Sequence, residues 1–194
     1  MRALTNVARA VQQDVEFSRK VRRIWAMIGG ISYPNPPPER PLLPGESFLA
    51  RPSHNVRCDV AAAKVVLESG IPLVMIGNDV TTRVRIDLEG IAQLDARQDA
   101  LSQGVVRLMR VWLDYRSRLF GSPVTWTCLH DALVVAEACG MAFTTCDPVR
   151  VELQDDGATV VTGDPDSHIR VARTVREQDF ERWYLTSVAA QAQL

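Results

Sequence analysis

The sequence has 194 residues, of which 46% are hydrophobic and 23% charged, and its net charge is -1 at pH 7. This size and composition are typical of one globular domain with a sizeable core, so residues 1–194 are expected to form a single domain. The near-neutral charge argues against nucleic acid or an anionic membrane as partner. No apolar run reaches the roughly 18 residues of a membrane span, and the N-terminus does not resemble a signal peptide. We therefore expect a cytoplasmic protein.

The cysteines argue against a disulfide framework or a zinc site, because no two of them have the CxxC spacing. In a chain of this size they are expected to be reduced, and most simply to be small buried hydrophobic residues. A reactive thiol is the alternative. The four residues are Cys58, Cys128, Cys139 and Cys146.

The first half of the chain alternates helical and strand patterns. A helix is expected over about 3–21, followed by a buried strand within 22–28 that stops at Gly29 and Gly30. Residues 31–55 are expected to form a long loop, because six prolines between Pro34 and Pro44 exclude regular structure there. In open α/β sheets, ligand sites lie in loops of this kind, at the carboxyl end of a strand.

The next segment predicts a parallel strand pair. Asp59 is a plausible N-cap and Gly70 a plausible C-terminal stop of one helix, and residues 71–77 follow as a buried strand. A strand, a helix and a second strand at this spacing form a βαβ unit.

The second half adds helices and a hairpin. Two helices are expected within 87–121, the second carrying Leu101, Val105, Leu108, Trp112 and Tyr115 on one side, and a further helix over 129–139. A hairpin is predicted around Asp155–Gly157, then a strand within 167–175 and an amphipathic helix over 176–192. The predicted class is α/β, with an open, mostly parallel, Rossmann-like sheet flanked by helices and a small β-hairpin.

Polar residues with chemical potential follow the proline-rich loop and precede a late helix. They are His54, Asn55 and Asp59, and then His130 and Asp131. Each has a purely structural interpretation. Asp131 is as well explained as a helix N-cap, Asn55 could close a turn, and His54 and His168 are more often exposed histidines than ligands.

Taken together, four segments resemble the inosine-uridine-preferring nucleoside hydrolases, in the same order along the chain. The first resembles that family's TGPLTN-like turn, helix and Met-Gly-Gly strand end, and the second its asparagine stretch, DPEAA-type helix and Gly-x-Asp-Val-Thr strand end. The third resembles its late His-Asp-Pro-Leu helix, and the fourth the hairpin that follows. In this chain they read RALTNVARAV…VRRIWAMIGG, HNVRCDVAAAKVVLESGIPLVMIGNDVT, CLHDALVVAEA and TTCDPVRVELQDDGATVVTGD.

The resemblance implies hydrolysis of the N-glycosidic bond of a ribonucleoside, giving ribose and free base. It also implies a Ca²⁺ ion held by oxygen ligands, which binds the ribose and the attacking water. By this resemblance Asp131 is a metal ligand and His130 the acid that protonates the leaving base. Asn55 contacts ribose, and the ribose-contacting methionine falls at Met27 or, in the other register, at Ile28.

The chain also departs from that family. Nothing in it resembles the family's N-terminal Asp-rich calcium motif, the position of the metal-binding threonine falls at Met1, and Ser53 stands where the family has a glutamate. We therefore expect the resemblance to cover a C-terminal portion of the family domain, and calcium to bind this chain alone weakly or not at all.

Three hypotheses follow from these departures. The chain is part of a nucleoside hydrolase, or a non-catalytic relative that serves as a binding or assembly module, or an unrelated α/β protein with a chance His-Asp pair. The expected partners are a ribonucleoside or ribose, and either further copies of the chain or a missing N-terminal segment that covers an exposed sheet edge.

Overall fold

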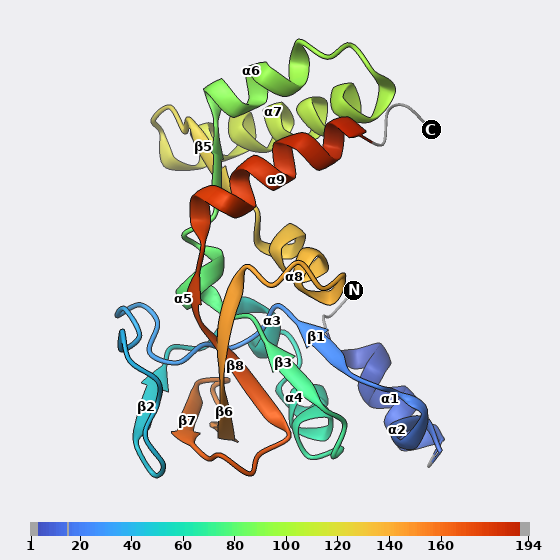
Figure 1. The fold of residues 1–194 in the computed structure, drawn as a ribbon, viewed down its shortest axis with the longest axis vertical. Helices are drawn as coiled ribbons and strands as arrows, with labels where there is room; N and C mark the ends of the chain where they lie inside the picture. Colours follow the sequence, from blue (N-terminus) through green and yellow to red (C-terminus); the bar gives the residue numbers. More distant parts are fainter. Residues whose placement is uncertain (1–3, 15, 191–194) are drawn as a thin grey trace.

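The computed structural model describes residues 4–14 and 16–190. A six-stranded sheet forms its base, in the order β1-β3-β8-β6-β7-β2, and a layer of helices made of α6, α7 and α9 lies beyond one end of it (Figure 1). The strands are β1 (Ile24–Ala26), β2 (Ser47–Ala50), β3 (Leu73–Met75), β6 (Thr144–Leu153), β7 (Thr159–Gly163) and β8 (Ile169–Val175).

The predicted α/β class is confirmed. β1, β3 and β8 pair in parallel, whereas β6 and β7 form the predicted hairpin and join β8 antiparallel. Two antiparallel steps return β7 to the direction of β8, so four of the six strands run the same way and only β6 and β2 oppose them.

Helices cover the sheet and its carboxyl end. α1 and α4 pack together against the sheet, and α8 lies between the sheet and the upper helices (Figure 1). The bounds are α1 (Thr5–Gln13), α2 (Phe17–Lys20), α3 (His54–Arg57), α4 (Val60–Leu67), α5 (Asn78–Thr81), α6 (Leu88–Asp95), α7 (Ala100–Phe120), α8 (His130–Ala138) and α9 (Glu177–Ala190). Within the described ranges, none of these helices has the length and apolarity needed to cross a membrane.

The helix signals identified in the sequence act as expected in α4. The Asp59 carboxylate accepts a hydrogen bond from the Ala62 N–H at 3.1 Å, and Gly70 adopts a φ of 73° just after the helix. A left-handed residue of this kind ends a helix at little cost only when it is glycine. The parallel pairing of β1 with β3 confirms the predicted strand pair.

Some expectations were wrong in detail. The first helix is divided into α1 and α2, and the last two residues of the predicted C-terminal helix lie outside the described residues. Residues 34–44 have no helix or strand, as their prolines require, but the loop expected over 31–55 contains the edge strand β2. β2 forms because β7 offers an open edge and no proline interrupts Ser47–Ala50.

The cysteines and α7 also differ from expectation. All four cysteines are free, but Cys139 is exposed and the other three are only partly buried. On α7, the core takes Val106, Met109 and Leu113, while Leu108 on the apolar side noted in the sequence is 72% exposed. α7 is apolar over a wide arc, so its sequence alone does not specify which part faces the core. A separate two-stranded sheet, β4 (Arg85–Asp87) with β5 (Trp126–Cys128), packs beside this helix.

Candidate functional site

The turn after β1 is held by side chains that come from elsewhere in the chain. The Gly29 N–H donates to Ser53 Oγ at 3.1 Å. The two oxygens of the Asp79 carboxylate accept from the Ile31 N–H at 2.7 Å and the Ser32 N–H at 3.1 Å. This carboxylate is buried at the start of α5, beyond the carboxyl end of β3, so it fixes the position of the chain as it leaves β1.

Glycine is required where these two strand ends meet. A Cβ on Gly77 would lie 2.4 Å from the Gly29 carbonyl oxygen, and a Cβ on Gly30 would lie 2.1 Å from Asp79 Oδ2. Burial raises the pKa of Asp79, although the backbone N–H groups that it binds act in the opposite direction.

Two of the predicted substrate-binding residues are in contact. The Asn55 side-chain amide donates to the Met27 carbonyl oxygen at 2.8 Å, and its nitrogen lies 3.4 Å from the Met27 sulfur. Ser53 caps α3 by accepting from the Val56 N–H at 3.4 Å, which orients the turn that carries Asn55. The alternative to Met27, Ile28, is 2% exposed and belongs to the core.

The hydroxyl of Ser53 is therefore used in the framework. It is buried and bonded to two backbone N–H groups, those of Gly29 and Val56. At the position where the resemblance leads one to expect a carboxylate, this chain has a residue that stabilises the glycine turn instead.

The ALTN segment lies against the same part of the molecule. The Thr5 hydroxyl donates to Asp59 Oδ2 at 2.5 Å, which joins the start of α1 to the start of α4. The position of Met1, where the resemblance places a metal-binding threonine, lies outside the described residues.

His130 lies at the start of α8 and is partly buried. Its Nδ1 is 2.8 Å from the hydroxyl of Thr81, a fully buried residue of α5. Burial lowers the pKa of His130, the neighbouring Asp131 raises it, and Arg116 lowers it further. The ring is thus oriented by one nitrogen, and no described residue forms a hydrogen bond with Nε2.

Asp131 is not the helix cap that its sequence position suggested. The N-cap of α8 is Leu129, no side chain caps the helix, and Asp131 is an exposed residue of the first turn. A carboxylate there is favoured by the helix dipole, but it is free to take another role.

His130 and Asp131 line a cavity of about 890 Å³. Its other walls come from β4, β5 and α7 and carry two tryptophans, Trp112 and Trp126, and two arginines, Arg85 and Arg116. Asp131 is its only lining carboxylate, and the described part of the chain contains no group of three or more His, Cys, Asp or Glu side chains placed to hold a metal.

The structure thus forms two groups from the predicted residues. Met27 and Asn55 touch each other but do not line the cavity of His130 and Asp131, although Tyr33, a few residues after Met27, does. Both groups lie beyond the carboxyl ends of β1 and β3, because His130 is bonded to Thr81 in the segment that follows β3.

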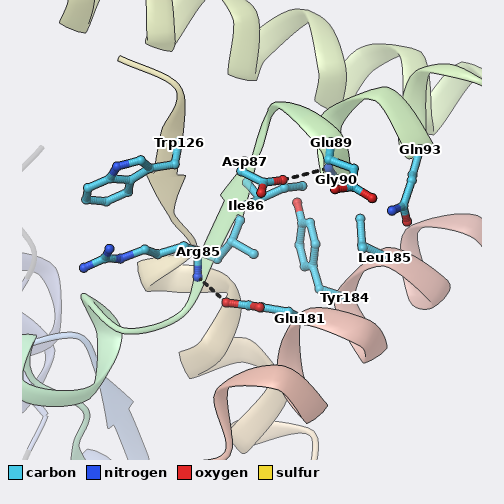
Figure 2. Close-up of a pocket in the computed structure, with 11 residues that line it drawn as sticks. Arg85, Ile86, Asp87, Glu89, Gly90, Gln93, Trp126, Glu181, Tyr184 and Leu185 are labelled. Carbon is cyan, nitrogen blue, oxygen red and sulfur yellow. Dashed lines mark hydrogen bonds between the residues drawn. The ribbon is translucent and has the colours of Figure 1, made fainter. Parts of the chain in front are cut away.

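Sequence reasoning missed several residues around these groups. Asp79 and Thr81 lie within the quoted segment GNDVT, so a signal for them was present. Trp112 and Arg116 carried no motif. A second cavity, of about 340 Å³, lies beside the first and shares Arg85 and Trp126 with it (Figure 2).

Relatives of known sequence support the resemblance. The chain is 32% identical over 133 residues to a pyrimidine-specific ribonucleoside hydrolase RihA of Citrobacter koseri, an alignment that covers 68% of this chain and 38% of the relative. It is also 32% identical over 166 residues to the RihA of Escherichia coli O8, covering 81% of this chain and 48% of the relative. The chain therefore spans less than half of the length of these relatives.

Solved structures show the same fold. A purine-preferring ribonucleoside hydrolase from Gardnerella vaginalis superposes with a TM-score of 0.79 at 22% identity, over 99% of this chain and 60% of that one. A plant nucleoside hydrolase, PpNRh1, superposes with a TM-score of 0.74 at 21% identity, over 97% and 60%.

The family model for inosine-uridine preferring nucleoside hydrolases matches residues 3–182, which is most of the chain. Together with the 32% identity to curated members over two thirds of its length, this match shows that the chain belongs to the inosine-uridine preferring nucleoside hydrolase family.

Proposed function

We propose that this chain carries the ribose-contacting and leaving-group parts of a site that hydrolyses the N-glycosidic bond of ribonucleosides. The observation that carries the proposal is the arrangement at the carboxyl edge of β1 and β3. Asn55 is bonded there to the Met27 carbonyl, and His130 is oriented by the hydroxyl of Thr81. Family membership supports the same reaction class.

After its structural hydrogen bond, each of the Asn55 and His130 side chains keeps one polar atom for the substrate. The Asn55 amide nitrogen is used on Met27, which leaves its carbonyl oxygen to accept a hydrogen bond from a ribose hydroxyl. The Thr81 contact uses Nδ1 of His130 and leaves Nε2 for the leaving base. When the bond between C1′ and the base nitrogen breaks, the electron pair stays on the base. A proton from His130 neutralises the base, and water bonds to C1′ through its oxygen and releases one proton to solvent.

Calcium, which the family resemblance implies, is not matched by the described residues. Ca²⁺ takes about six to eight oxygen ligands, several of them carboxylates. At the cavity only Asp131 supplies one, and Ser53 stands where a further carboxylate was expected. The described residues do not fit a complete calcium site, so none of the steps above uses the ion.

The substrate proposal is a pyrimidine or purine ribonucleoside, with uridine as the first choice, since the curated relatives named above are pyrimidine-specific. Cytoplasmic location and assembly into a homo-oligomer remain predictions. Sedimentation of the purified chain tests the second of them.

The test of the proposed function is ribose release from uridine and inosine, measured with and without Ca²⁺. It is run on the chain alone and on the chain with an added fragment that carries the Asp-rich segment of a relative. We expect release only when the fragment is present, and we expect Asn55→Ala and Asp131→Ala each to lower it by about 100-fold or more. Asp155→Ala, in the exposed hairpin turn, is the matched control and is expected to have no effect. The absence of release under every condition would refute the hydrolase proposal.

A second function is favoured by Ser53. A serine has no carboxylate to offer at the position where an active hydrolase is expected to have one. Its hydroxyl instead accepts from two backbone N–H groups of the fold. A chain that binds ribose or nucleoside without cleaving it, as a binding or assembly module, fits that observation. Saturable uridine binding with no ribose release, fragment included, is the result that would select this alternative.

A further inference from the structure

The long helix α7 has a second apolar face, on the side away from the core. The helix packs against α6, α9 and β5 at the end of the molecule opposite the sheet, and its Val106, Met109 and Leu113 belong to the core (Figure 1). Seven further apolar residues of α7 are at least 43% exposed; they are Leu101, Leu108, Val111, Trp112, Tyr115, Leu119 and Phe120. Single exposed apolar residues are ordinary on a globular protein, but a contiguous patch marks an interaction surface.

The exposed residues follow a seven-residue repeat. Leu101, Leu108 and Tyr115 are seven residues apart, and so are Trp112 and Leu119. An apolar repeat of this length lines up along one side of a helix and is typical of helices that pack against another helix. We define the outer stripe of α7 as Leu101, Leu108, Val111, Trp112, Tyr115 and Leu119. It runs along nearly the whole helix, which at about 1.5 Å per residue is about 30 Å long.

The outer stripe is complementary to itself when two copies of α7 run antiparallel. A pair that crosses at the middle of the helix places Leu108 beside Val111 of the second copy. The same register places Leu101 beside Leu119 of the second copy at each end. Because the two copies are then related by a two-fold rotation, each of these contacts occurs twice.

Gly104 leaves room for an aromatic ring in this register. A Cβ on Gly104 would meet nothing within 4 Å, so the space beside the helix is open there. Gly104 comes three residues after Leu101, on the same side of the helix. The antiparallel register puts Tyr115 of the second copy, which is 54% exposed, over this glycine. A large side chain opposite a small residue is the kind of fit that closely packed helices need.

The charges beside the stripe are complementary in the same register. Arg107 is exposed and forms no salt bridge with another residue of the described ranges. In the antiparallel pair it lies near Asp114 of the second copy. The bond of Asp114 to Arg118 on its own helix is exposed and therefore weak. In a parallel pair, Arg107 and Asp114 would each face an apolar residue of the stripe instead.

We propose that two copies of this chain associate through the outer stripe, with their α7 helices antiparallel. The net charge of -1 gives the copies little mutual repulsion. Leu108 and Trp112 also line the cavity of His130, so the second copy would lie at the rim of that cavity. The inference gives the predicted homo-oligomer a specific face, and it does not depend on hydrolysis.

The test is sedimentation equilibrium over a range of chain concentrations, with matched lysine variants. For the natural chain we expect a reversible equilibrium between one copy and two. In Val111→Lys the dissociation constant should rise about tenfold or more, because the charge would be buried between two apolar surfaces. Val135→Lys, on α8, is the control. Val135 is 60% exposed against 66% for Val111, and this variant should leave the equilibrium unchanged.

Two further changes test the antiparallel register. In Gly104→Leu the new Cβ meets nothing within its own chain and the helix should become more stable, but the side chain would collide with Tyr115 of the second copy. The dissociation constant should again rise about tenfold or more. Arg107→Asp should raise it about fivefold, because it would face Asp114 of the second copy, and adding Asp114→Arg should restore it. Circular dichroism checks that each variant folds.

Three results would overturn the inference. They are a chain that is monomeric at every concentration, a self-association that Val111→Lys and Gly104→Leu both leave unchanged, and an affinity that the exchange of Arg107 and Asp114 does not restore. A monomeric chain that binds the Asp-rich fragment of a relative, and loses this binding in Val111→Lys, would overturn it in favour of that segment. Because no nucleoside is used, a failure here leaves the hydrolase proposal standing. Equally, a chain that releases no ribose can still form this dimer.

Discussion

Two regions meet at the proposed site, and they differ in how their polar groups are satisfied. The segment between β1 and α3 contains the glycine turn and the proline-rich loop. It is bonded internally through Ser53 and to the distant residues Asp79 and Asp147. The wall made of α7 and β4 instead presents Arg85 and Arg116 without ion partners, beside partly exposed tryptophans.

The difference separates groups that shape the protein from groups available to a ligand. A buried N–H that lacks an acceptor costs stability, so the loop side must be satisfied within the fold. The wall of α7 and β4 instead has hydrogen-bonding groups without partners among the described residues, and it lines a cavity. If this comparison is correct, substitutions in the first region should act on stability and those in the second on binding.

The largest effect is expected at the buried ion pair that anchors the proline-rich loop. Arg173 Nε donates to Asp147 Oδ2 at 2.8 Å, and that oxygen also accepts from the Leu42 N–H at 3.0 Å. Both side chains are about nine-tenths buried. Asp147→Ala leaves the arginine buried without its counter-ion, with only the Glu39 carbonyl oxygen still accepting from it, so the free energy of unfolding in urea should fall by about 3–5 kcal/mol.

The exposed pair of Asp114 with Arg118 is the control for this prediction. Asp114→Ala should change the free energy of unfolding by at most about 0.5 kcal/mol, because solvent already screens that pair. Similar losses in the two variants would show that burial does not set the strength of these pairs.

A somewhat smaller loss is expected at Asp79. Asp79→Ala removes the acceptors of two backbone N–H groups, those of Ile31 and Ser32, and should destabilise the protein by about 2–4 kcal/mol. Asp79→Asn keeps one acceptor oxygen, so its free energy of unfolding should lie between those of the natural chain and of Asp79→Ala. Urea denaturation of both variants measures these values. An unchanged urea midpoint for Asp79→Ala would mean that the turn is not held by this carboxylate.

Trp112 belongs to the open wall and should behave differently. Trp112→Phe keeps an aromatic ring but loses the hydrogen bond to Thr127, so stability should fall by only about 1 kcal/mol. Affinity for uridine should fall more clearly, about fivefold to tenfold, because the larger stacking surface is lost. A large loss of stability in Trp112→Phe with unchanged affinity would mean that Trp112 serves the fold and not binding.

The smallest expected effect is the pH dependence that comes from Glu46, at the end of the proline-rich loop. The Arg40 guanidinium, bonded to Glu46 at 2.7 Å, lowers the pKa of Glu46 from the usual 4.5 to about 2. A carboxylate with a lowered pKa contributes stability above pH 4.5, and this contribution is lost as the pH falls through about 2. Carbon-detected NMR titration should place the midpoint near 2 in the natural chain. In Arg40→Met the pKa should rise but stay below the usual value, because the Leu43 N–H still donates to Glu46.

Much of the fold could be predicted because its signals are local. Asp59 caps α4, Gly70 ends it, and Asp155–Gly157 turns the β6–β7 hairpin, each through bonds within a few residues. The short elements β2, β4 and β5 were missed because each is stable only through pairing with a distant strand.

The site divides in the same way. Met27, Asn55, His130 and Asp131 were named from motifs in the sequence, and the structure places the first two in contact. Arg116 and Trp112 could not be found in this way, because an arginine on an amphipathic helix looks the same whether or not it faces a carboxylate.

The sequence by itself determined the α/β class, the order of most elements and the family, because helix caps, turns and motifs are short-range properties. Only the tertiary structure decided that Ser53 is a framework residue, that Asp131 does not cap its helix, and that two arginines share one cavity. The physical reason is that hydrogen bonding and charge compensation of a buried group depend on which distant residues fill the space around it.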